Sequence, residues 1–159
     1  MPRLLLLLLI YCTIAKGQHE SLSDLRFPVD KELLLTLVNT KRSQGCQCGD
    51  TYYPEVSPLT WNKKLANAAQ KHSDEMAKRK KLTHYSKNGD DPGKRLSKEG
   101  YRWHAYAENV AMGYFDERTV IQGWLSSPAH CANIMNPLVK EMGVAYNGKY
   151  WTQVFGSEE

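Results

Sequence analysis

Residues 142–155 read MGVAYNGKYWTQVF and carry the clearest fold signal in the sequence. Two runs rich in apolar and aromatic residues, 142–146 and 150–155, flank the dipeptide Asn147-Gly148. This dipeptide is the strongest two-residue signal for a tight turn between antiparallel strands. We therefore predict a β-hairpin in this part of the chain. Together with the helices predicted upstream, the hairpin assigns the protein to the α+β class.

Three stretches upstream have apolar residues at the spacing of one helix face, namely 28–44, 62–80 and 116–125. Each begins with residues that favour a helix start, a proline or a capping Asn or Asp. Ser127-Pro128 predicts a further short helix, because serine caps helices and proline suits the first helical position. No internal repeat and no second domain is evident.

The segments between these helices carry weaker signals. Residues 45–58 hold two prolines and two cysteines, and residues 83–100 are rich in Gly, Asp, Lys and Ser, so both are expected to be loops. Residues 108–112 suggest a short helical turn. Long loops in compact domains are often functional, which makes 83–100 a candidate part of a site.

The N-terminal segment has the pattern of a signal peptide. Residues 1–3 are short and basic, 4–10 are an unbroken apolar run, and 15–17 place small residues at a cleavage site. The apolar run is far shorter than the ~20 residues of a membrane-spanning helix. We therefore expect a signal peptide over 1–17, a disordered lead-in over 18–27, no transmembrane segment, and secretion to the periplasm or the cell exterior.

Composition limits the partners of the exported chain. The full sequence has 21 basic and 17 acidic residues; without Arg3 and Lys16 the net charge is +2. This is too weak to indicate nucleic-acid binding, and no basic stripe interleaved with aromatic residues is present. The basic run 78–81 is interpreted as the solvated end of a helix, where cations suit the helix dipole.

Export also determines how the cysteines are interpreted. Cys12 leaves with the signal peptide, so the mature chain keeps Cys46, Cys48 and Cys131. Three thiols in an oxidising compartment suggest one disulfide and one spare thiol. Cys131 is the expected common partner, bound to either Cys46 or Cys48. Zinc is the rival interpretation of the C-x-C pair, but zinc ligands are usually two to four residues apart.

The histidines are the first candidates for chemistry. His72 lies on the apolar face of a predicted helix and is expected to be a packed, hydrogen-bonded core residue. His104 is expected to be exposed. His84 and His130 fall in a loop and at a helix start, and spacing alone does not show that they meet.

No nucleophilic constellation is complete. Ser126 and Ser127 lack the G-x-S-x-G context, and Cys131 is expected to be in a disulfide, so neither a serine nor a cysteine hydrolase is indicated. No H-E-x-x-H motif, phosphate-binding loop or EF-hand loop is present. Residues 88–91 are interpreted as a polar turn rather than a calcium site.

Six segments occur in order along the chain: PLTWN (58–62), HSDEMA (72–77), Gly100-Tyr101, AENVAMG (107–113), GWLSSPAHCANIMNP (123–137) and YWTQVFG (150–156). Together they resemble the bacterial-type branch of the CAP superfamily (cysteine-rich secretory proteins, antigen 5 and pathogenesis-related 1 proteins), and the resemblance covers 28–156. It implies a three-layer α-β-α sandwich around a central antiparallel sheet.

The resemblance also implies a cleft lined by His84, Glu108 and His130. In many members such residues hold zinc or another divalent cation. Many eukaryotic members carry a second glutamate three residues after the tryptophan that is Trp124 here. This chain has Ser127 at that position. The missing carboxylate implies weaker metal binding.

A disulfide pairing follows from the same resemblance. Bacterial-type relatives commonly have arginine after the cleft histidine, whereas a subset has cysteine there together with an upstream Cys-Gly. Cys131 and Cys48-Gly49 match this subset, which implies a Cys48–Cys131 bridge and leaves Cys46 as the spare thiol.

These observations predict a non-catalytic secreted binding module that engages a lipid or cell-envelope partner and could ligate a divalent cation. We expect a monomer, although Cys46 could join two copies. One alternative is a metal-assisted hydrolase that uses His84, Glu108 and His130. The other is a structural or adhesive extracellular module.

Overall fold

The computed structural model describes residues 28–158. The predicted signal peptide and lead-in, 1–27, lie outside the described residues. The helices are α1 (Lys31–Gln44), α2 (Lys63–Arg79), α3 (Pro92–Lys98), α4 (Glu117–Leu125) and α5 (Pro128–Ile134), and the strands are β1 (Cys46–Cys48), β2 (Thr51–Tyr53), β3 (Thr60–Trp61), β4 (Trp103–Met112), β5 (Glu141–Asn147) and β6 (Tyr150–Glu158). None of these helices combines the length and apolar character needed to cross a membrane.

The predicted C-terminal hairpin is confirmed and forms the centre of the main sheet. β5 and β6 are antiparallel, with Asn147 paired to Tyr150 across the turn. The strand order is β3-β5-β6-β4, so β6 lies between β5 and β4. All pairs are antiparallel except that the two-residue edge strand β3 runs parallel to β5.

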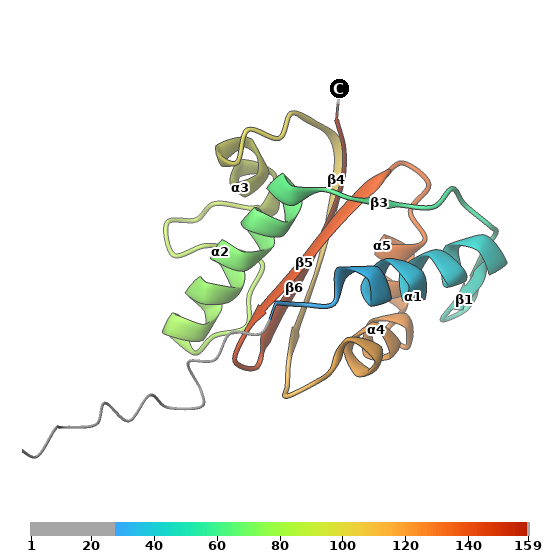
Figure 1. Ribbon diagram of the computed structural model, residues 1–159, viewed down its shortest axis with the longest axis horizontal. Helices are drawn as coiled ribbons and strands as arrows, with labels where there is room; N and C mark the ends of the chain where they lie inside the picture. Colours follow the sequence, from blue (N-terminus) through green and yellow to red (C-terminus); the bar gives the residue numbers. More distant parts are fainter. Residues whose placement is uncertain (1–27, 159) are drawn as a thin grey trace, which may run out of the picture.

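The helices cover both faces of this sheet. Figure 1 shows α2 and α3 on one face and α1, α4 and α5 on the other. Helices on both sides of a central sheet give each sheet face an apolar partner. The predicted α+β class and three-layer sandwich are therefore confirmed.

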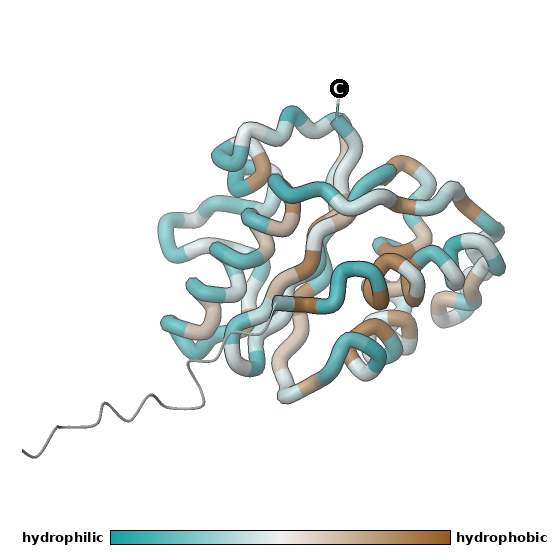
Figure 2. The backbone as a smooth tube through the Cα atoms, in the orientation of Figure 1, coloured by the Kyte–Doolittle hydropathy of each residue, from teal (hydrophilic) through white to brown (hydrophobic). Residues whose placement is uncertain are grey.

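β6 supplies side chains to both layers of the core, because successive residues of a strand point to opposite faces. Trp151 and Phe155 belong to the cluster that also holds residues of α1, α4 and α5. Val154 packs instead with Leu65 and other residues of α2. Figure 2 shows apolar segments in both α1 and α4, whereas α2 and α3 carry more polar residues.

The close packing of α2 on the sheet depends on one glycine. A Cβ atom at Gly143 of β5 would lie 2.1 Å from the backbone nitrogen of Ala66 in α2. No side chain fits in that space, so glycine lets the helix backbone approach the strand directly. This approach fixes the position of α2, which carries His72.

Three expectations about the segments between the predicted helices are wrong. Residues 83–100 are not a continuous loop, because they contain α3. Residues 45–58 hold the short β1–β2 hairpin as well as loop. Residues 108–112 are not a helical turn; they belong to β4, which pairs with β6 along its whole length. Pairing and burial outweigh the low strand propensity of a Glu-Asn pair in the middle of β4.

Buried Arg42 joins α1 to the end of α5 within the same layer. Its side chain is fully buried, and its guanidinium donates hydrogen bonds to the backbone carbonyl oxygens of Ser57, Ile134, Asn136 and Val139. Burial lowers its pKa to about 10, which keeps it charged at neutral pH. A cation at the C-terminal end of a helix is favourable, since carbonyl groups there lack helical partners.

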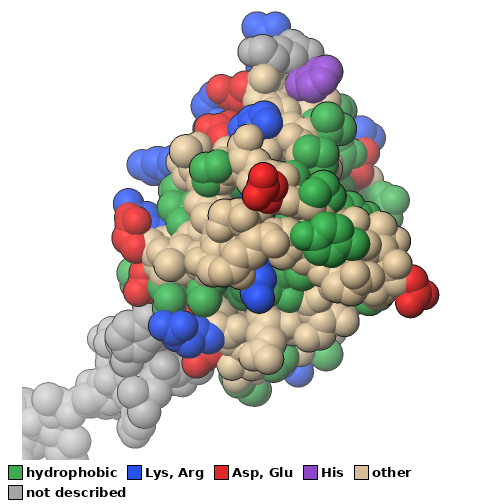
Figure 3. Space-filling model, turned by 90° about the vertical axis from the view of Figure 1, so that its right-hand side faces the viewer, with side chains coloured by type: hydrophobic (Ala, Val, Ile, Leu, Met, Phe, Trp, Pro, Cys, Tyr) green, Lys and Arg blue, Asp and Glu red, His purple; other side chains and the backbone are tan. Residues whose placement is uncertain are grey.

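The face on the α1 side of the molecule, drawn in Figure 3, has mixed character. Apolar side chains gather over part of it, and acidic and basic side chains are interspersed around them. No single sign of charge dominates this face.

Candidate functional site

The predicted carboxylate, Glu108, lies in the middle of the edge strand β4. It pairs with Val154 of β6, and its side chain is only 2% exposed. Since neighbouring strand residues alternate between faces, the Glu108 side chain points toward α2 and α3, and Asn109 points toward α5. Glu108 is therefore a buried anion, and such a group requires charged or hydrogen-bonding partners.

Arg95 of α3 provides the main partner. Its Nη2 donates to Glu108 Oε2 at 2.5 Å, and its Nη1 donates to the carbonyl oxygens of His84 and Asp90. The Arg95 side chain is 8% exposed. α3 exists at this place because Asp91 accepts a hydrogen bond from Lys94 N as N-cap and Pro92 occupies the first turn. The buried ion pair neutralises the carboxylate charge.

His84 provides the second partner, at the other carboxylate oxygen. Its Nδ1 lies 2.9 Å from Glu108 Oε1, and 46% of its side chain is exposed. A carboxylate acceptor favours the tautomer that carries the proton on Nδ1. Nε2 of His84 then keeps a lone pair. The loop after α2 and the AEN segment of β4 are thus joined by a direct hydrogen bond.

His72 of α2 lies behind this pair. It is fully buried, and its Nε2 is 2.7 Å from the carbonyl oxygen of Thr83 and 4.0 Å from Glu108 Oε1. Burial is the main cause that lowers its pKa, and it outweighs the opposing attraction of the Glu108 carboxylate. The expected packed, hydrogen-bonded core histidine is confirmed. Its proximity to Glu108 also makes it part of the candidate site.

His130 reaches the site from the other side of β4. It lies in the first turn of α5 and is half-buried. Burial lowers its pKa, and the neighbouring His84 imidazole lowers it further. His130 is therefore a neutral imidazole at neutral pH.

A buried amide network fixes α5, and with it His130, against the sheet. Asn109 Nδ2 donates to the carbonyl oxygen of His130 at 3.2 Å and to Gln153 Oε1 at 3.0 Å. Asn133 Nδ2 donates to Asn109 Oδ1 at 2.9 Å and to the carbonyl oxygen of Glu108 at 3.2 Å. Buried polar groups paired in this way specify one arrangement of the elements that carry them.

The three predicted ligands do not form a compact ligand set. Within 28–158, three cysteines make up the one group of at least three His, Cys, Asp or Glu residues whose ligand atoms all lie within 4.8 Å of one another. His84 and Glu108 are in contact, and His130 is close enough to His84 to affect its own pKa. The metal site at these residues remains a prediction.

A cavity of about 300 Å³ opens beside the site, on the outer side of Arg95. It lies between α2, α3 and the segment that joins them. The predicted residues His84, Glu108 and His130 are not among its lining residues, which are Ala68, Lys71, Glu75, Ser86, Lys87, Asn88, Asp90, Arg95, Lys98 and Glu99. Its charged groups include the ion pairs Lys71–Glu99 and Lys98–Asp90.

The cysteines lie on the side of α5 away from this cavity. Cys48 of β1 is joined to Cys131 of α5 in a disulfide, with 5.5 Å between their Cα atoms. Cys46 is a free, half-buried thiol. Because two of the three sulfurs are bonded to each other, the cysteine group is not a metal ligand set in this oxidation state.

A sequence profile described as the cysteine-rich secretory protein family (CAP) matches residues 35–155. The chain belongs to this family. The match covers both the α2–β4 side and the α5 side of the site, so the whole Glu108 region lies within the CAP domain.

Relatives of known structure share the fold of this CAP domain. An extracellular protein from Bacillus anthracis that contains an SCP domain superposes with a TM-score of 0.70 at 27% identity, over 80% of this chain and 40% of that one. An outer surface protein of Borrelia burgdorferi superposes with a TM-score of 0.65 at 17% identity, over 84% of this chain and 98% of that one.

The curated relatives are longer proteins. The uncharacterized membrane protein YlbC of Bacillus subtilis is 30% identical over 100 residues, which are 63% of this chain. Those residues are 29% of YlbC. For YkwD of the same organism the identity is 29%, over 63% of this chain and 40% of that protein. The chain therefore spans less than half the length of the curated relatives it matches.

The sequence did not reveal the roles of Arg95 and Asn109. Arg95 lay in an assumed loop, and arginine is mostly a surface residue. Asn109 lay in an assumed helical turn. A strand interpretation of 103–112 would have placed Glu108 and Asn109 on opposite faces, with separate partners. The capping pair Asp91-Pro92 was the available signal for α3.

Proposed function

We propose that this CAP domain is exported and acts as a non-catalytic binding module that holds a divalent cation between His84 and His130. The observation that supports the proposal best is the hydrogen bond between His84 Nδ1 and the buried Glu108 carboxylate. A carboxylate behind a histidine fixes the ring orientation and raises the basicity of the outer nitrogen, as in many zinc sites.

In this proposal Glu108 positions a ligand rather than binding the cation itself. Its two oxygens already accept hydrogen bonds from His84 and Arg95, and its side chain is buried. His84 Nε2 and a ring nitrogen of the neutral His130 are the protein ligands. Two imidazoles suit zinc and leave coordination positions for water or an outside oxygen donor.

Weak binding is expected, because the site has little negative charge. Arg95 neutralises Glu108, and Ser127 stands where many eukaryotic members are expected to have a second carboxylate. The partner proposed for the open positions is an oxygen donor from a lipid head group or another cell-envelope ligand. A partner that supplies an anion would compensate for the carboxylate that the chain lacks.

The hydrolase alternative places a different demand on Glu108. A general base must be within hydrogen-bond reach of the proton it removes from a bound water. With one oxygen held by Arg95 and the other by His84, Glu108 has no oxygen without a partner in the described structure. This arrangement favours binding over catalysis.

Zinc titration by calorimetry tests the proposal. The mature protein should bind one zinc with a Kd below ~1 mM, and the variant His84→Ala/His130→Ala should lose this binding. Cys46→Ser should be present in all samples, so that the free thiol does not contribute. His104→Ala serves as a matched control, since His104 is exposed on β4, and its binding should equal that of the parent.

Failure of the parent to bind zinc more tightly than ~1 mM would refute the cation site and leave the structural or adhesive module as the interpretation. Equal binding by the double variant would also refute it. Activity assays on ester and amide substrates, with and without chelator, distinguish ligand binding from catalysis. Chelator-sensitive turnover abolished by Glu108→Gln would replace the binding module with the hydrolase.

A further inference from the structure

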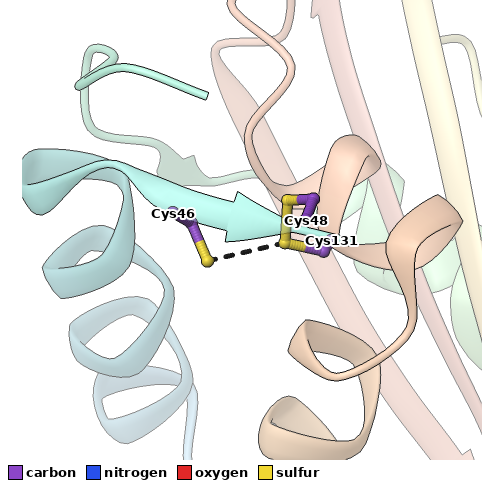
Figure 4. A group of neighbouring side chains, drawn as sticks. All are labelled: Cys46, Cys48 and Cys131. Carbon is purple, nitrogen blue, oxygen red and sulfur yellow. Dashed lines mark hydrogen bonds between the residues drawn. A yellow bond between two sulfur atoms is a disulfide. The ribbon is translucent and has the colours of Figure 1, made fainter. Parts of the chain in front are cut away.

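Strand β1 presents two cysteines to one partner. Its sequence is Cys46-Gln47-Cys48, and alternate residues of a strand point to the same side. Cys48 is buried, Cys46 is half-buried and Gln47 is exposed, so both cysteines face α5. Figure 4 shows the sulfurs of Cys46 and Cys48 on the side of the strand that faces Cys131. One cysteine of α5 therefore faces two possible partners.

The unused thiol touches the existing bond. Cys46 Sγ lies 3.5 Å from Cys131 Sγ, which is itself bonded to Cys48 Sγ. Thiol–disulfide exchange begins with a thiolate in contact with one sulfur of a disulfide, and its rate depends on access to that sulfur. Here the chain itself brings the attacking sulfur into contact with Cys131.

We propose that Cys46, Cys48 and Cys131 form an internal thiol–disulfide exchange site with two bonding states. The Cys46 thiolate attacks Cys131 Sγ and forms a Cys46–Cys131 bond. The Cys48–Cys131 bond breaks, and Cys48 leaves as the thiolate and takes up the proton that Cys46 released. One disulfide and one thiol are present before and after, so no outside oxidant or reductant is needed.

The backbone around β1 allows Cys46 to replace Cys48 as the partner of Cys131. Gly45 and Gly49 lie on either side of it, both with positive φ values, 72° and 61°. Such backbone conformations are readily available to glycine and strained for other residues. β1 pairs with β2 over three residue pairs and belongs to a separate two-stranded sheet. A small movement of this hairpin along α5 therefore leaves the main sheet intact.

The exchange site adjoins the candidate cation site. His130 directly precedes Cys131, and a Cβ on Gly49 would lie 2.9 Å from Pro128 Cγ in the first turn of α5. A change of partner moves β1 against the helix turn that carries His130. The position of β1 therefore differs between the two bonding states next to His130, one of the proposed cation ligands. The exchange chemistry itself depends on the three sulfurs alone and stands whether or not a cation binds.

Timed alkylation tests the proposal on the mature, non-reduced protein. Trypsin leaves Cys46 and Cys48 in one peptide, 43–63, and Cys131 in another, 119–140. The protein is incubated at pH 8.5 for timed intervals, alkylated with N-ethylmaleimide and then digested with trypsin near neutral pH, because alkylated thiols no longer exchange. Fragment-ion spectra of the linked peptides then show which cysteine carries the label. We expect label on both Cys46 and Cys48, with the Cys48 share independent of protein concentration.

Two variants make the test decisive. Cys46→Ser removes the attacking thiol, so Cys48 should then stay unlabelled and bonded to Cys131. Cys48→Ser should form a Cys46–Cys131 bond within the monomer. Label confined to Cys46 in the parent over several hours would overturn the proposal. So would label on Cys48 in the Cys46→Ser variant, or a Cys48→Ser product bonded only between two copies.

Discussion

Two consecutive residues of α5 lead into differently built parts of the molecule. His130 lies near His84, which belongs to the charged group of Glu108, Arg95 and His84, and in this group each carboxylate oxygen has a hydrogen-bonding partner. Cys131 faces the sulfur group, where three sulfurs compete for one bond. In the charged group, removing either Arg95 or Glu108 leaves the other as a buried charge without its opposite charge. The sulfur group has one member more than its bond requires.

This difference teaches that the two groups respond to substitution in opposite ways. When the oppositely charged partner of a buried charge is removed, no other such partner takes its place, so the protein loses stability. A cysteine next to a second cysteine can be replaced as bonding partner. The predictions below test this contrast, beginning with the largest expected effect.

The largest loss should come from Cys131→Ser, which removes the disulfide and every alternative to it. A bond between residues 83 apart contributes about 4–5 kcal/mol in the chain-entropy description. Urea unfolding without reductant should show this loss. Cys48→Ser should cost clearly less, because Cys46 can form the bond instead. Equal losses in the two variants would remove the contrast between the sulfur group and the charged group.

Arg95→Met should be the next largest change, with a loss of about 3 kcal/mol, because it leaves Glu108 buried without its cation. Arg95→Met/Glu108→Leu should recover part of this stability, since no unpaired charge remains. The matched control is Arg79→Met, which breaks the half-exposed ion pair with Glu75 and should cost below about 0.5 kcal/mol. If Arg95→Met and Arg79→Met lose the same amount, the Glu108 group is not held by buried charge.

Features of these two regions could be predicted from the sequence where the signal is local, and could not where it depends on contacts with distant residues. The hairpin was predictable because Asn147-Gly148 determines its turn locally. The bond from Cys131 to one member of the C-x-C pair followed from counting thiols. The choice of Cys48 needed the family resemblance, because spacing does not distinguish two cysteines that face the same way on a strand.

The charged group was harder to predict because its contacts are long-range. β4 was missed since Glu108 and Asn109 are poor strand formers, and only pairing with β6 makes a strand of them. Arg42 and Arg95 can be buried because their guanidinium groups donate hydrogen bonds to carbonyl and carboxylate oxygens of distant segments. Composition places arginine at the surface, so no local pattern marks these two residues.

Asn109→Leu should cause an intermediate loss of stability, because it breaks the hydrogen bonds that hold α5 against β4. It removes the donor to His130 O and Gln153 and the acceptor of Asn133, which should cost about 2 kcal/mol in urea unfolding. Zinc binding should weaken about tenfold as His130 loses its fixed position. Exposed Asn88→Ala is the control and should change stability by less than about 0.5 kcal/mol. Unchanged stability of Asn109→Leu would mean that the network does not hold α5.

The smallest expected effect is the pH dependence that His72 contributes to the charged group. Burial lowers its pKa from the usual 6.5 in the folded state. As pH falls below 6.5 the unfolded chain therefore takes up a proton before the folded chain does. Stability is full above pH 6.5 and falls as pH drops toward the lowered folded-state pKa. Over pH 7.5 to 5, His72 should therefore contribute a loss of stability that a variant without a titrating group at this position does not show.

His72→Gln isolates this contribution, because glutamine keeps an N–H donor for the Thr83 carbonyl oxygen but does not titrate. Urea unfolding of both proteins at several pH values should give curves that separate at neutral pH and converge toward pH 5. Parallel curves would show that His72 binds its proton equally well in the folded and unfolded chain. The group around Glu108 would then accept a charged imidazole without loss of stability. In that case its charges would not be fully paired, and the contrast with the sulfur group would not hold.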